Sequence, residues 1–337
     1  MATGRKHSMR KKILVAGGAG YIGSHACKNL FQNGYEPVVL DNLVYGHPWA
    51  LKWGKFYQGN IADKNLVEKI VSENNIESVI HFAAYAYVGE SVSYPQKYYE
   101  NNLENGIRFL DQLVKSGVKN LVFSSTCATY GIPSVTPITE ETPQNPINPY
   151  GKTKHMFEQI LGDYRTAYGL NAIALRYFNA AGADNELEIG EDHQPETHLI
   201  PLAIRAAYDP DFQLTVYGTD YPTKDGTCVR DYIHVSDLAD AHRLAIQKLE
   251  RQTAAGYFDF FNLGTGNGFS VKEIITAIEE VSNKKVKIQY GARRPGDPPI
   301  LVASNSKARS ELGWQDKHSA LQNIIHTACQ WYLKKNS

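Results

Sequence analysis

The sequence predicts an α/β protein built on a doubly wound parallel sheet, with a smaller domain after it. Short apolar runs alternate with helical patterns from residue 12 to residue 176, which is the order of elements in a parallel sheet. The first run leads directly into a glycine-rich turn at 17–23. After residue 182 the alternation stops and polar, loop-like sequence follows. We therefore expect two domains, at 11–180 and 181–337.

Each expected strand is a short apolar run, and most of these runs are followed by a helical pattern. In chain order the strands are Lys12–Ala16, Glu36–Leu40, Lys55–Gln58, Ser78–Phe82, Asn120–Ser125 and Asn171–Arg176, and the helices are 21–33, Lys64–Asn74, Tyr98–Val114 and Tyr150–Tyr168. Leu214–Tyr217 and Val229–His234 are expected as strands of the second domain. A later stretch, at about 234–262, is expected to return to the first domain.

Composition argues against several classes of protein. The 337 residues carry 35 Lys and Arg against 35 Asp and Glu, so no net charge suggests nucleic acid or an anionic membrane as a partner. No apolar run is long enough to span a membrane. Four cysteines lie far apart without metal-ligand spacing, so we expect no metal and reduced thiols. Residues 1–10 lack the apolar segment of a secretory signal, and a cytoplasmic protein is expected.

The turn Gly17-Gly-Ala-Gly20-Tyr-Ile-Gly23 stands between the first strand and the first helix. Glycines at these three positions allow a tight turn, close approach of a pyrophosphate and close packing of helix on strand, while the helix N-terminus favours the phosphate charge. The second strand ends at Asp41, about 20 residues later, where a carboxylate accepts from both hydroxyls of a ribose. This spacing predicts a dinucleotide site and favours NAD over NADP.

Further candidates follow the strands of the same sheet, because loops at the carboxyl ends of parallel strands hold ligands. Asn60 and Ile61 are placed to edge an adenine, by an amide hydrogen bond and an apolar contact. The small residues Ala83 and Ala84 let a dinucleotide approach. Thr126 puts a hydroxyl at the end of the fifth strand.

Tyr150 and Lys154 are four residues apart at the start of the helix that begins with Asn148-Pro-Tyr-Gly-Lys-Thr-Lys154. In a helix this spacing puts both side chains on one face. A nearby cation favours the phenolate and lowers the pKa of a tyrosine, which can then act as a general base. Thr126 would lie where Tyr150 points. Alone, a Tyr-x-x-x-Lys pair is a weak signal, and the surrounding strands and turn give it its meaning.

Two basic positions in the second domain suggest a clamp for phosphate. Arg230 lies in the strand pattern Val229–His234, and Arg294 lies in Arg293-Arg294-Pro-Gly-Asp297. Guanidinium is always charged and binds phosphate in a bidentate manner. Because the chain has no net charge, an anionic ligand must be met by such local groups.

In combination these motifs resemble the extended short-chain dehydrogenase/reductase family, whose first domain is a Rossmann fold, and within it the UDP-glucose (UDP-galactose) 4-epimerases. The likeness runs from about residue 11 to the C-terminus. The specific parts are Gly-Gly-Ala-Gly-Tyr-Ile-Gly-Ser-His25, Val88-Gly-Glu-Ser91, Asn148-Pro-Tyr-Gly-Lys152, Leu175-Arg-Tyr-Phe-Asn179 and Gly218-Thr-Asp-Tyr-Pro-Thr-Lys-Asp-Gly226 through Val229-Arg-Asp-Tyr-Ile-His234.

The resemblance implies an NAD-binding domain at 11–180, a UDP-sugar-binding domain at 181–337, and catalysis by Tyr150, Lys154 and Thr126. Tyr150 would take the proton of the sugar 4-hydroxyl while hydride passes to NAD, giving a 4-keto sugar that is then reduced on its other face. The implied cofactor residues are Gly17, Gly20, Tyr21, Ile22, Gly23, Asp41, Asn42, Asn60, Ile61, Phe82, Ala83, Ala84, Asn101, Ser124, Tyr150, Lys154 and Tyr177. The implied substrate residues are Thr126, Tyr150, Asn179, His198, Leu199, Thr215, Val216, Tyr217, Arg230, Arg294, Asp297 and Leu301.

Several alternatives stay open. The residues around Thr126 also resemble those of the UDP-arabinose (UDP-xylose) 4-epimerases. Hexose-restricted relatives have tyrosine where this chain has Leu301, which suggests that N-acetylhexosamines can enter the site. Sugar-nucleotide 4,6-dehydratases carry an Asp-Glu pair where this chain has Cys127 and Ala128, which disfavours elimination. A catalytically silent NAD-binding protein on the same fold is a further alternative. Ala86 and Asn60 replace a lysine and an aspartate that many relatives have.

The family also implies a homodimer. Relatives pair the helices near Tyr98–Val114 and Gly151–Tyr168 across a two-fold axis, and two-fold dimers are the commonest soluble oligomers. Phe157, Leu161 and Tyr164 are more apolar than a solvated face needs. The competing interpretation is that this whole stripe packs on its own sheet.

Overall fold

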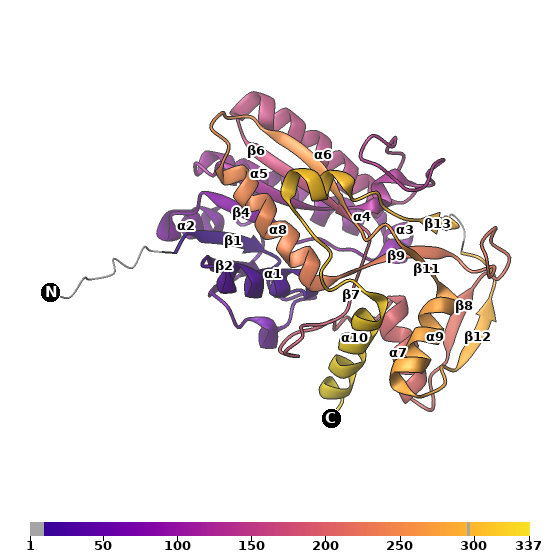
Figure 1. The fold of residues 1–337 in the computed structure, drawn as a ribbon. Helices are drawn as coiled ribbons and strands as arrows, with labels where there is room; N and C mark the ends of the chain where they lie inside the picture. Colours follow the sequence, from indigo (N-terminus) through magenta and orange to yellow (C-terminus); the bar gives the residue numbers. More distant parts are fainter. Residues whose placement is uncertain (1–9, 295–296) are drawn as a thin grey trace.

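A seven-stranded parallel sheet forms the centre of the larger domain in the computed structural model, which describes residues 10–294 and 297–337 (Figure 1). Its strand order is β10-β6-β5-β4-β1-β2-β3. The strands are β1 (Lys12–Ala16), β2 (Glu36–Asp41), β3 (Lys55–Gln58), β4 (Ser78–His81), β5 (Asn120–Thr126), β6 (Asn171–Tyr177) and β10 (Phe258–Leu263). The six strands expected in this sheet are all present, within a residue at each end, and the predicted fold class is confirmed.

Helices cover both faces of this sheet. Helices α1 (Tyr21–Gln32) and α8 (Val235–Glu250) lie on one face, and α2 (Lys64–Asn74), α5 (Asn105–Lys115) and α6 (Pro149–Tyr168) lie on the other (Figure 1). Strand β1 shows why its run is uniformly apolar: Ile13 and Val15 enter the first core, while Leu14 and Ala16 enter the second. A strand buried on both faces has no polar alternation.

Helix α6 carries the tyrosine and lysine singled out above. Asn148 caps its first turn by accepting a hydrogen bond from Gly151 N at 2.8 Å, and Gly169, with φ +68°, ends it. Phe157 and Leu161 are fully buried in the core of their own chain. The competing interpretation of the apolar stripe is therefore correct for these two residues.

The helix expected at Tyr98–Val114 is composite. It consists of α4 (Pro95–Tyr98), a π-helical turn at Tyr99–Glu104, and α5. Asn102 in this turn is buried. Its side-chain amide accepts from Tyr85 N at 2.8 Å, donates to Tyr85 O at 2.9 Å and donates to Thr153 Oγ1 on α6 at 3.4 Å. The wide turn thus ties the loop after β4 to the helix of Tyr150.

The smaller domain packs its helices on two small sheets. Strand β9 (Val229–His234) lies at the centre of one sheet, paired with β7 (Asn179–Ala181), β11 (Gly268–Ser270) and β13 (Ile300–Leu301), and β8 (Leu214–Tyr217) pairs with β12 (Ile288–Gly291). Helices α7 (Leu199–Tyr208), α9 (Val271–Ser282) and α10 (Leu321–Lys335) share one apolar core. Two short helices, α3 (Val88–Ser93) and α4, lie near the junction (Figure 1).

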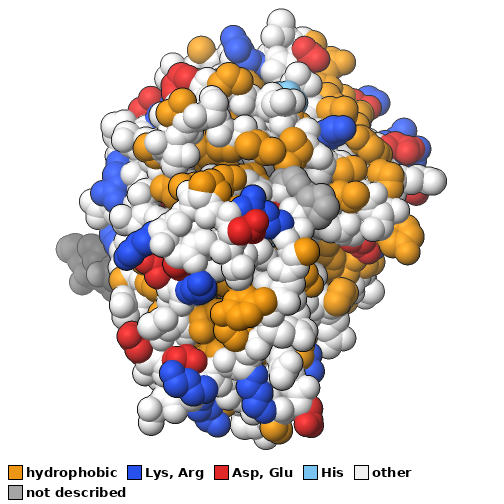
Figure 2. All heavy atoms as spheres, turned by 90° about the vertical axis from the view of Figure 1, so that its right-hand side faces the viewer, with side chains coloured by type: hydrophobic (Ala, Val, Ile, Leu, Met, Phe, Trp, Pro, Cys, Tyr) orange, Lys and Arg blue, Asp and Glu red, His pale blue; other side chains and the backbone are white. Residues whose placement is uncertain are grey.

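The described surface fits the balanced composition. On the face shown in Figure 2, Lys and Arg side chains lie interspersed with Asp and Glu, with apolar patches between them. None of the helices in residues 10–294 and 297–337 combines the length and apolarity that a bilayer crossing requires.

Candidate active site

The glycine-rich turn is tightly packed at two of its three glycines and less tightly at the third. At Gly17, with φ +83°, an added Cβ would lie 2.6 Å from Ala83 N, and at Gly23 it would lie 2.1 Å from Gly17 O. Both positions therefore need glycine so that β1, β4 and α1 can approach one another. At Gly20 the nearest atom would be 3.5 Å away. Tyr21 begins α1 at this point, so the positive end of its dipole points to the turn.

Asp41 lies beside this turn, at the end of β2. Its buried carboxylate accepts from Ala19 N at 3.0 Å and from Leu43 N at 2.8 Å, and burial raises its pKa despite these bonds. Asn42 is exposed and accepts from Val44 N. Two backbone donors fix the carboxylate in place and leave lone pairs for ribose hydroxyls.

One of the two adenine candidates, Asn60, lines a cavity. This cavity, of about 660 Å³, is also lined by the cofactor candidate Asn101 and by Tyr85 and Lys97. The Asn60 amide oxygen accepts from Ala62 N at 2.9 Å, so its amide N–H groups stay available. The side chain of Ile61 is buried in the core, which leaves its backbone for a ligand contact.

The catalytic candidates meet at the carboxyl ends of β5 and β6. Register pairs Thr126 with Tyr177, and the Ser124 and Tyr177 hydroxyls are hydrogen-bonded to each other. Lys154 Nζ donates to Ser124 O at 2.8 Å and lies 6.0 Å from the ring centre of Tyr150. Helix α6 and two strands thus place these side chains in one buried group.

Burial dominates the electrostatics of the catalytic pair. It raises the pKa of Tyr150 to about 12; the hydrogen bond with Thr126 lowers this pKa, and Cys127 raises it. Burial also lowers the pKa of Lys154 to about 7, and its Nζ is bonded to a carbonyl. A positive charge near the Tyr150 hydroxyl would oppose the effect of burial, because it favours the phenolate.

A buried ion pair behind the catalytic group was missed by the sequence analysis. Glu158 lies one turn after Lys154 and receives two hydrogen bonds from Arg176 on β6, at 2.6 and 3.0 Å, and one from Ser125 Oγ at 2.5 Å. Arg176 also donates to Tyr130 OH at 2.9 Å. Two opposite charges in otherwise apolar, buried segments were the available signal, because such charges are almost always paired.

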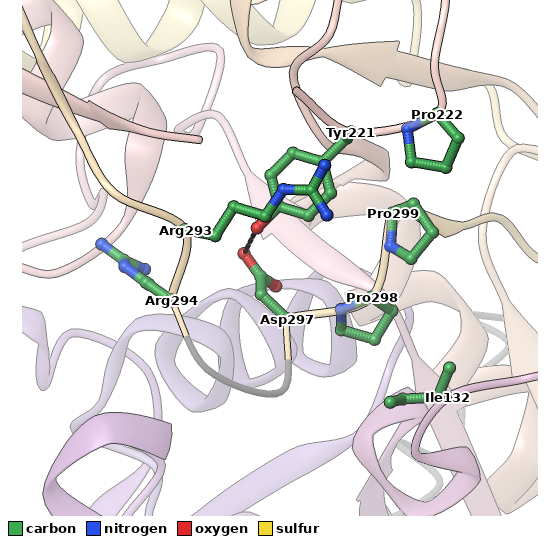
Figure 3. Close-up of a pocket in the computed structure, with 8 residues that line it drawn as sticks. All are labelled: Ile132, Tyr221, Pro222, Arg293, Arg294, Asp297, Pro298 and Pro299. Carbon is green, nitrogen blue, oxygen red and sulfur yellow. Dashed lines mark hydrogen bonds between the residues drawn. The ribbon is translucent and has the colours of Figure 1, made fainter. Parts of the chain in front are cut away.

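Of the two phosphate-clamp candidates, Arg294 lines a second cavity, of about 460 Å³, together with Asp297 (Figure 3). Arg230 forms an ion pair with Asp297, and Tyr221 OH donates to the same carboxylate at 3.5 Å. Arg293 lies over the Tyr221 ring, while Arg294 points to the opposite side, where its guanidinium stacks on Tyr217 at 4.2 Å. Ile132, Pro222, Pro298 and Pro299 complete the wall.

The side chains of the other substrate candidates differ in burial: some are partly exposed, and others lie in the hydrophobic core. Leu301 packs with Cys127 against a small buried cluster next to Thr126, and β13 pairs it with Arg230. The Asn179 amide donates to Asp231 O at 3.2 Å. The side chain of Val216 is buried in the core, so only its backbone can meet a ligand. Thr215 accepts from Gln289, Leu199 packs partly on the core, and His198 Nδ1 lies 2.7 Å from Glu191.

Residues 13–264 match the NAD dependent epimerase/dehydratase family. The chain belongs to this family. Its curated relatives include UDP-glucose 4-epimerase of Rhizobium leguminosarum bv. trifolii, which is 50% identical over 96% of this chain and 98% of its own. Among solved structures, UDP-glucose 4-epimerase from Brucella ovis in complex with NAD is 51% identical with a TM-score of 0.92, covering 95% of this chain and 98% of its own. The same enzyme from Bifidobacterium longum in complex with NAD+ and UDP is 39% identical with a TM-score of 0.91, covering 97% and 99%.

The geometry fits the cofactor of this NAD-dependent family. The open cradle at Gly20, the N-terminus of α1 and the fixed carboxylate of Asp41 are the groups that a pyrophosphate and a ribose require. The family also contains dehydratases, but the positions after Thr126 hold Cys127 and Ala128. Burial raises the pKa of the Cys127 thiol to about 12, so it stays protonated at neutral pH.

Proposed function

We propose that the protein interconverts UDP-glucose and UDP-galactose by NAD-dependent epimerisation at carbon 4 of the sugar. The observation that carries this proposal is the buried group of Tyr150, Thr126 and Lys154 at the carboxyl ends of β5 and β6, in a chain of the epimerase/dehydratase family. NAD, when bound, accepts a hydride from carbon 4 and returns it, and its oxidised ring brings a positive charge.

Each catalytic side chain has one task in this reaction. Tyr150 holds and releases the proton of the 4-hydroxyl, as general base in one half-reaction and general acid in the other. Thr126 hydrogen-bonds Tyr150 and lowers its pKa, and it lies where it can also meet the reacting oxygen. Lys154, fixed by Ser124 O, adds a positive charge that favours the phenolate. Because the same tyrosine serves both faces of carbon 4, the keto sugar must turn over in the site.

Elimination is disfavoured by the residues after Thr126. A 4,6-dehydratase needs an acid and a base to remove water, and a buried neutral thiol and a methyl group supply neither. The keto sugar therefore has reduction as its only outcome. The proposal is tested by incubating the purified protein with UDP-galactose and measuring the UDP-glucose formed. If no UDP-glucose forms although NAD is bound, the proposal is refuted in favour of a catalytically silent NAD-binding protein.

We infer that the UDP diphosphate replaces Asp297 as the ion-pair partner of Arg230. The pair is partly buried, and its Asp297 lines the same cavity as Arg294. A diphosphate offers more acceptor oxygens than one carboxylate, and release of Asp297 leaves it free for a uridine ribose hydroxyl. The proline-lined wall of the cavity suits the apolar faces of the nucleoside.

We infer that the sugar pocket is permissive at carbon 2. Leu301 and Cys127, the residue after Thr126, pack against the same small buried cluster, and a tyrosine at position 301 would extend farther from β13 than leucine does. Loss of a contact of this size changes discrimination by about 1–3 kcal/mol, so the N-acetylated pair should be converted more slowly, not excluded. Leu301→Tyr should suppress conversion of UDP-N-acetylgalactosamine and spare that of UDP-galactose. If the ratio of the two activities is unchanged in Leu301→Tyr, this position does not determine the specificity. UDP-arabinose should be tested as a third substrate in the same assay.

We infer that the protein forms a homodimer through α5 and α6. On α6 a second apolar row, with a spacing of four, consists of Met156, Ile160, Tyr164 and Tyr168: Met156 is 36% and Tyr168 61% exposed, while Ile160 and Tyr164 are partly buried against the core. A row of this kind on a solvated helix suits a helix-to-helix contact. Light scattering at micromolar concentration should give twice the chain mass, and Met156→Glu should halve it. A wild-type monomer would contradict the inference.

A further inference from the structure

The loop between β7 and α7 gathers four side chains that the reaction above does not use as a set. Glu191, His193, Glu196 and His198 each bring one ligand atom to a common point, all four within 4.8 Å of one another. The set contains two imidazole nitrogens and two carboxylate oxygens, and its spacing in sequence is Glu-x-His-x-x-Glu-x-His. Cysteine spacing alone was considered in the sequence analysis, so this cluster was missed.

Four nitrogen-to-oxygen distances within the cluster are close to those between the ligands of a tetrahedral ion. His193 Nδ1 lies 3.2 Å from Glu191 Oε1 and 3.7 Å from Glu196 Oε2, and His198 Nδ1 lies 2.7 Å from Glu191 Oε1 and 3.2 Å from Glu196 Oε1. Four ligands about 2.0–2.1 Å from a tetrahedral zinc ion lie about 3.3 Å from one another. The observed separations scatter around this value.

The atoms converge without hydrogen-bond geometry. Glu191 Oε1 and His193 Nδ1 are fully buried, and among the described residues neither has a hydrogen-bond partner. The Glu191 side chain is only 6% exposed. A buried carboxylate oxygen and a buried ring nitrogen that make no hydrogen bond are costly, even where they lie at ion-pair distance from each other. They aim at the centre of the cluster, as ligands around an ion do.

From this geometry we propose that Glu191, His193, Glu196 and His198 bind one divalent transition-metal cation of the zinc class. Two imidazoles favour such a metal over magnesium or calcium, which prefer oxygen ligands alone. Four protein ligands close the coordination sphere, so the ion is structural and takes no part in proton or hydride transfer.

In a second cluster, nearby in sequence, the carboxylates have a protein cation as their hydrogen-bond donor. Asp184, Glu186 and Glu188 surround the Lys28 ammonium, with Nζ to oxygen distances of 2.7, 2.6 and 2.8 Å. Each of the three carboxylates accepts a hydrogen bond from the lysine, and this acidic trio therefore serves as the internal control.

The ion would fix the loop between the two domains. Trp331 Nε1 on α10 donates to Glu191 O at 2.9 Å, and the His193 ring contacts Tyr21, at the start of α1, edge-on with ring centres 6.1 Å apart. His198 precedes the first residue of α7. One bound ion thus connects the nucleotide turn, the first helix of the smaller domain and the last helix of the chain.

The experiment measures metal directly. Untagged protein is dialysed against a chelator, returned to Zn²⁺ with a competing fluorescent chelator, and its zinc content is read by plasma mass spectrometry. Wild type and Glu186→Gln should hold about one zinc per chain, while His193→Gln and Glu191→Gln should lose affinity by about 10²-fold or more. Co²⁺ in place of zinc should give the intense visible bands of a tetrahedral site.

Two outcomes would overturn the proposal. If wild type holds no zinc above the competitor, the cluster is a network of His and Glu ion pairs only. If His193→Gln binds zinc as wild type does, the ion lies elsewhere. Should His193→Gln fail to fold, Glu196→Gln replaces it with the same expected loss. None of these readouts depends on epimerase activity.

Discussion

The ion pair of Glu158 and Arg176 should control the charge of Lys154. Glu158 follows Lys154 by four residues on α6, and its charge raises the pKa of Lys154 against the larger effect of burial, which holds that pKa at about 7. Glu158→Gln removes this charge with little change in shape. The pKa of Lys154 should therefore fall below its present value.

The size of the shift follows from the spacing. Side chains four positions apart in a helix are about 6 Å apart, and two unit charges at that distance interact by about 3 kcal/mol at an effective dielectric constant of about 20. This is about two pKa units. Arg176, whose guanidinium bonds both oxygens of Glu158, has a separate effect of opposite sign that is the same in the wild type and in Glu158→Gln. We expect a fall of about two units in Glu158→Gln, and a rise in Arg176→Met, which removes a positive charge instead.

The assay is an NMR titration of protein labelled at lysine Cε, with the Lys154 signal assigned by its loss in Lys154→Arg. Asp163→Asn, on the exposed side of α6, is the matched control and should leave the titration unchanged. Both test variants should also unfold more easily, since removing one partner of a buried pair costs about 3–5 kcal/mol. Shifts of the same sign in Glu158→Gln and Arg176→Met would refute the electrostatic reasoning and leave only a packing effect.

Three further predictions concern the base, the cofactor and the UDP clamp. Tyr150→Phe should reduce epimerisation by about 10²-fold or more without loss of bound NAD, and near-normal turnover would exclude Tyr150 as the base. Gly23→Ala places a methyl group 2.1 Å from Gly17 O, so the purified protein should lack NAD on release by denaturation; a full complement would show that the turn can widen. Arg230→Ala should raise KM for UDP-galactose about tenfold, as expected from loss of a charged hydrogen bond of about 1.5–3 kcal/mol, while unaltered UDP affinity by calorimetry would move the clamp elsewhere.

Most of the large sheet could be predicted because its strands are local signals. A run such as Lys12–Ala16 is apolar throughout, and both of its faces enter a core. The pairing within the smaller domain could not be predicted in the same way. Strand β9 joins β7, β11 and β13, and these partners lie far from it and from one another along the chain. Hydrophobic periodicity carries no information about such distant pairs.

In the candidate site, too, some residues could be predicted from local sequence, whereas the contacts set by the tertiary structure could not. Gly17, Asp41 and Tyr150 follow from spacing, because the chemistry needs those residues at those intervals. The hydrogen-bond partner of Lys154 does not follow from spacing. It is the backbone oxygen of Ser124, and the contact depends on how α6 lies across β5. The pKa of Tyr150 depends on burial, which the motif does not encode. The π-helical turn at Tyr99–Glu104 is likewise a change of hydrogen-bond pattern that leaves the apolar spacing nearly unaltered.

The position of β10 at the edge of the large sheet has a consequence for biosynthesis. Phe261 and the α8 residues Leu238 and Ala245 cover apolar side chains of β6 such as Ile173, yet they leave the ribosome long after β6 does. Until then the nascent N-terminal half exposes the part of one sheet face that α8 later covers, and an unpaired edge strand, the features that favour aggregation. The first half should therefore require chaperone protection during translation, and neither half should be expressible as a stable separate fragment.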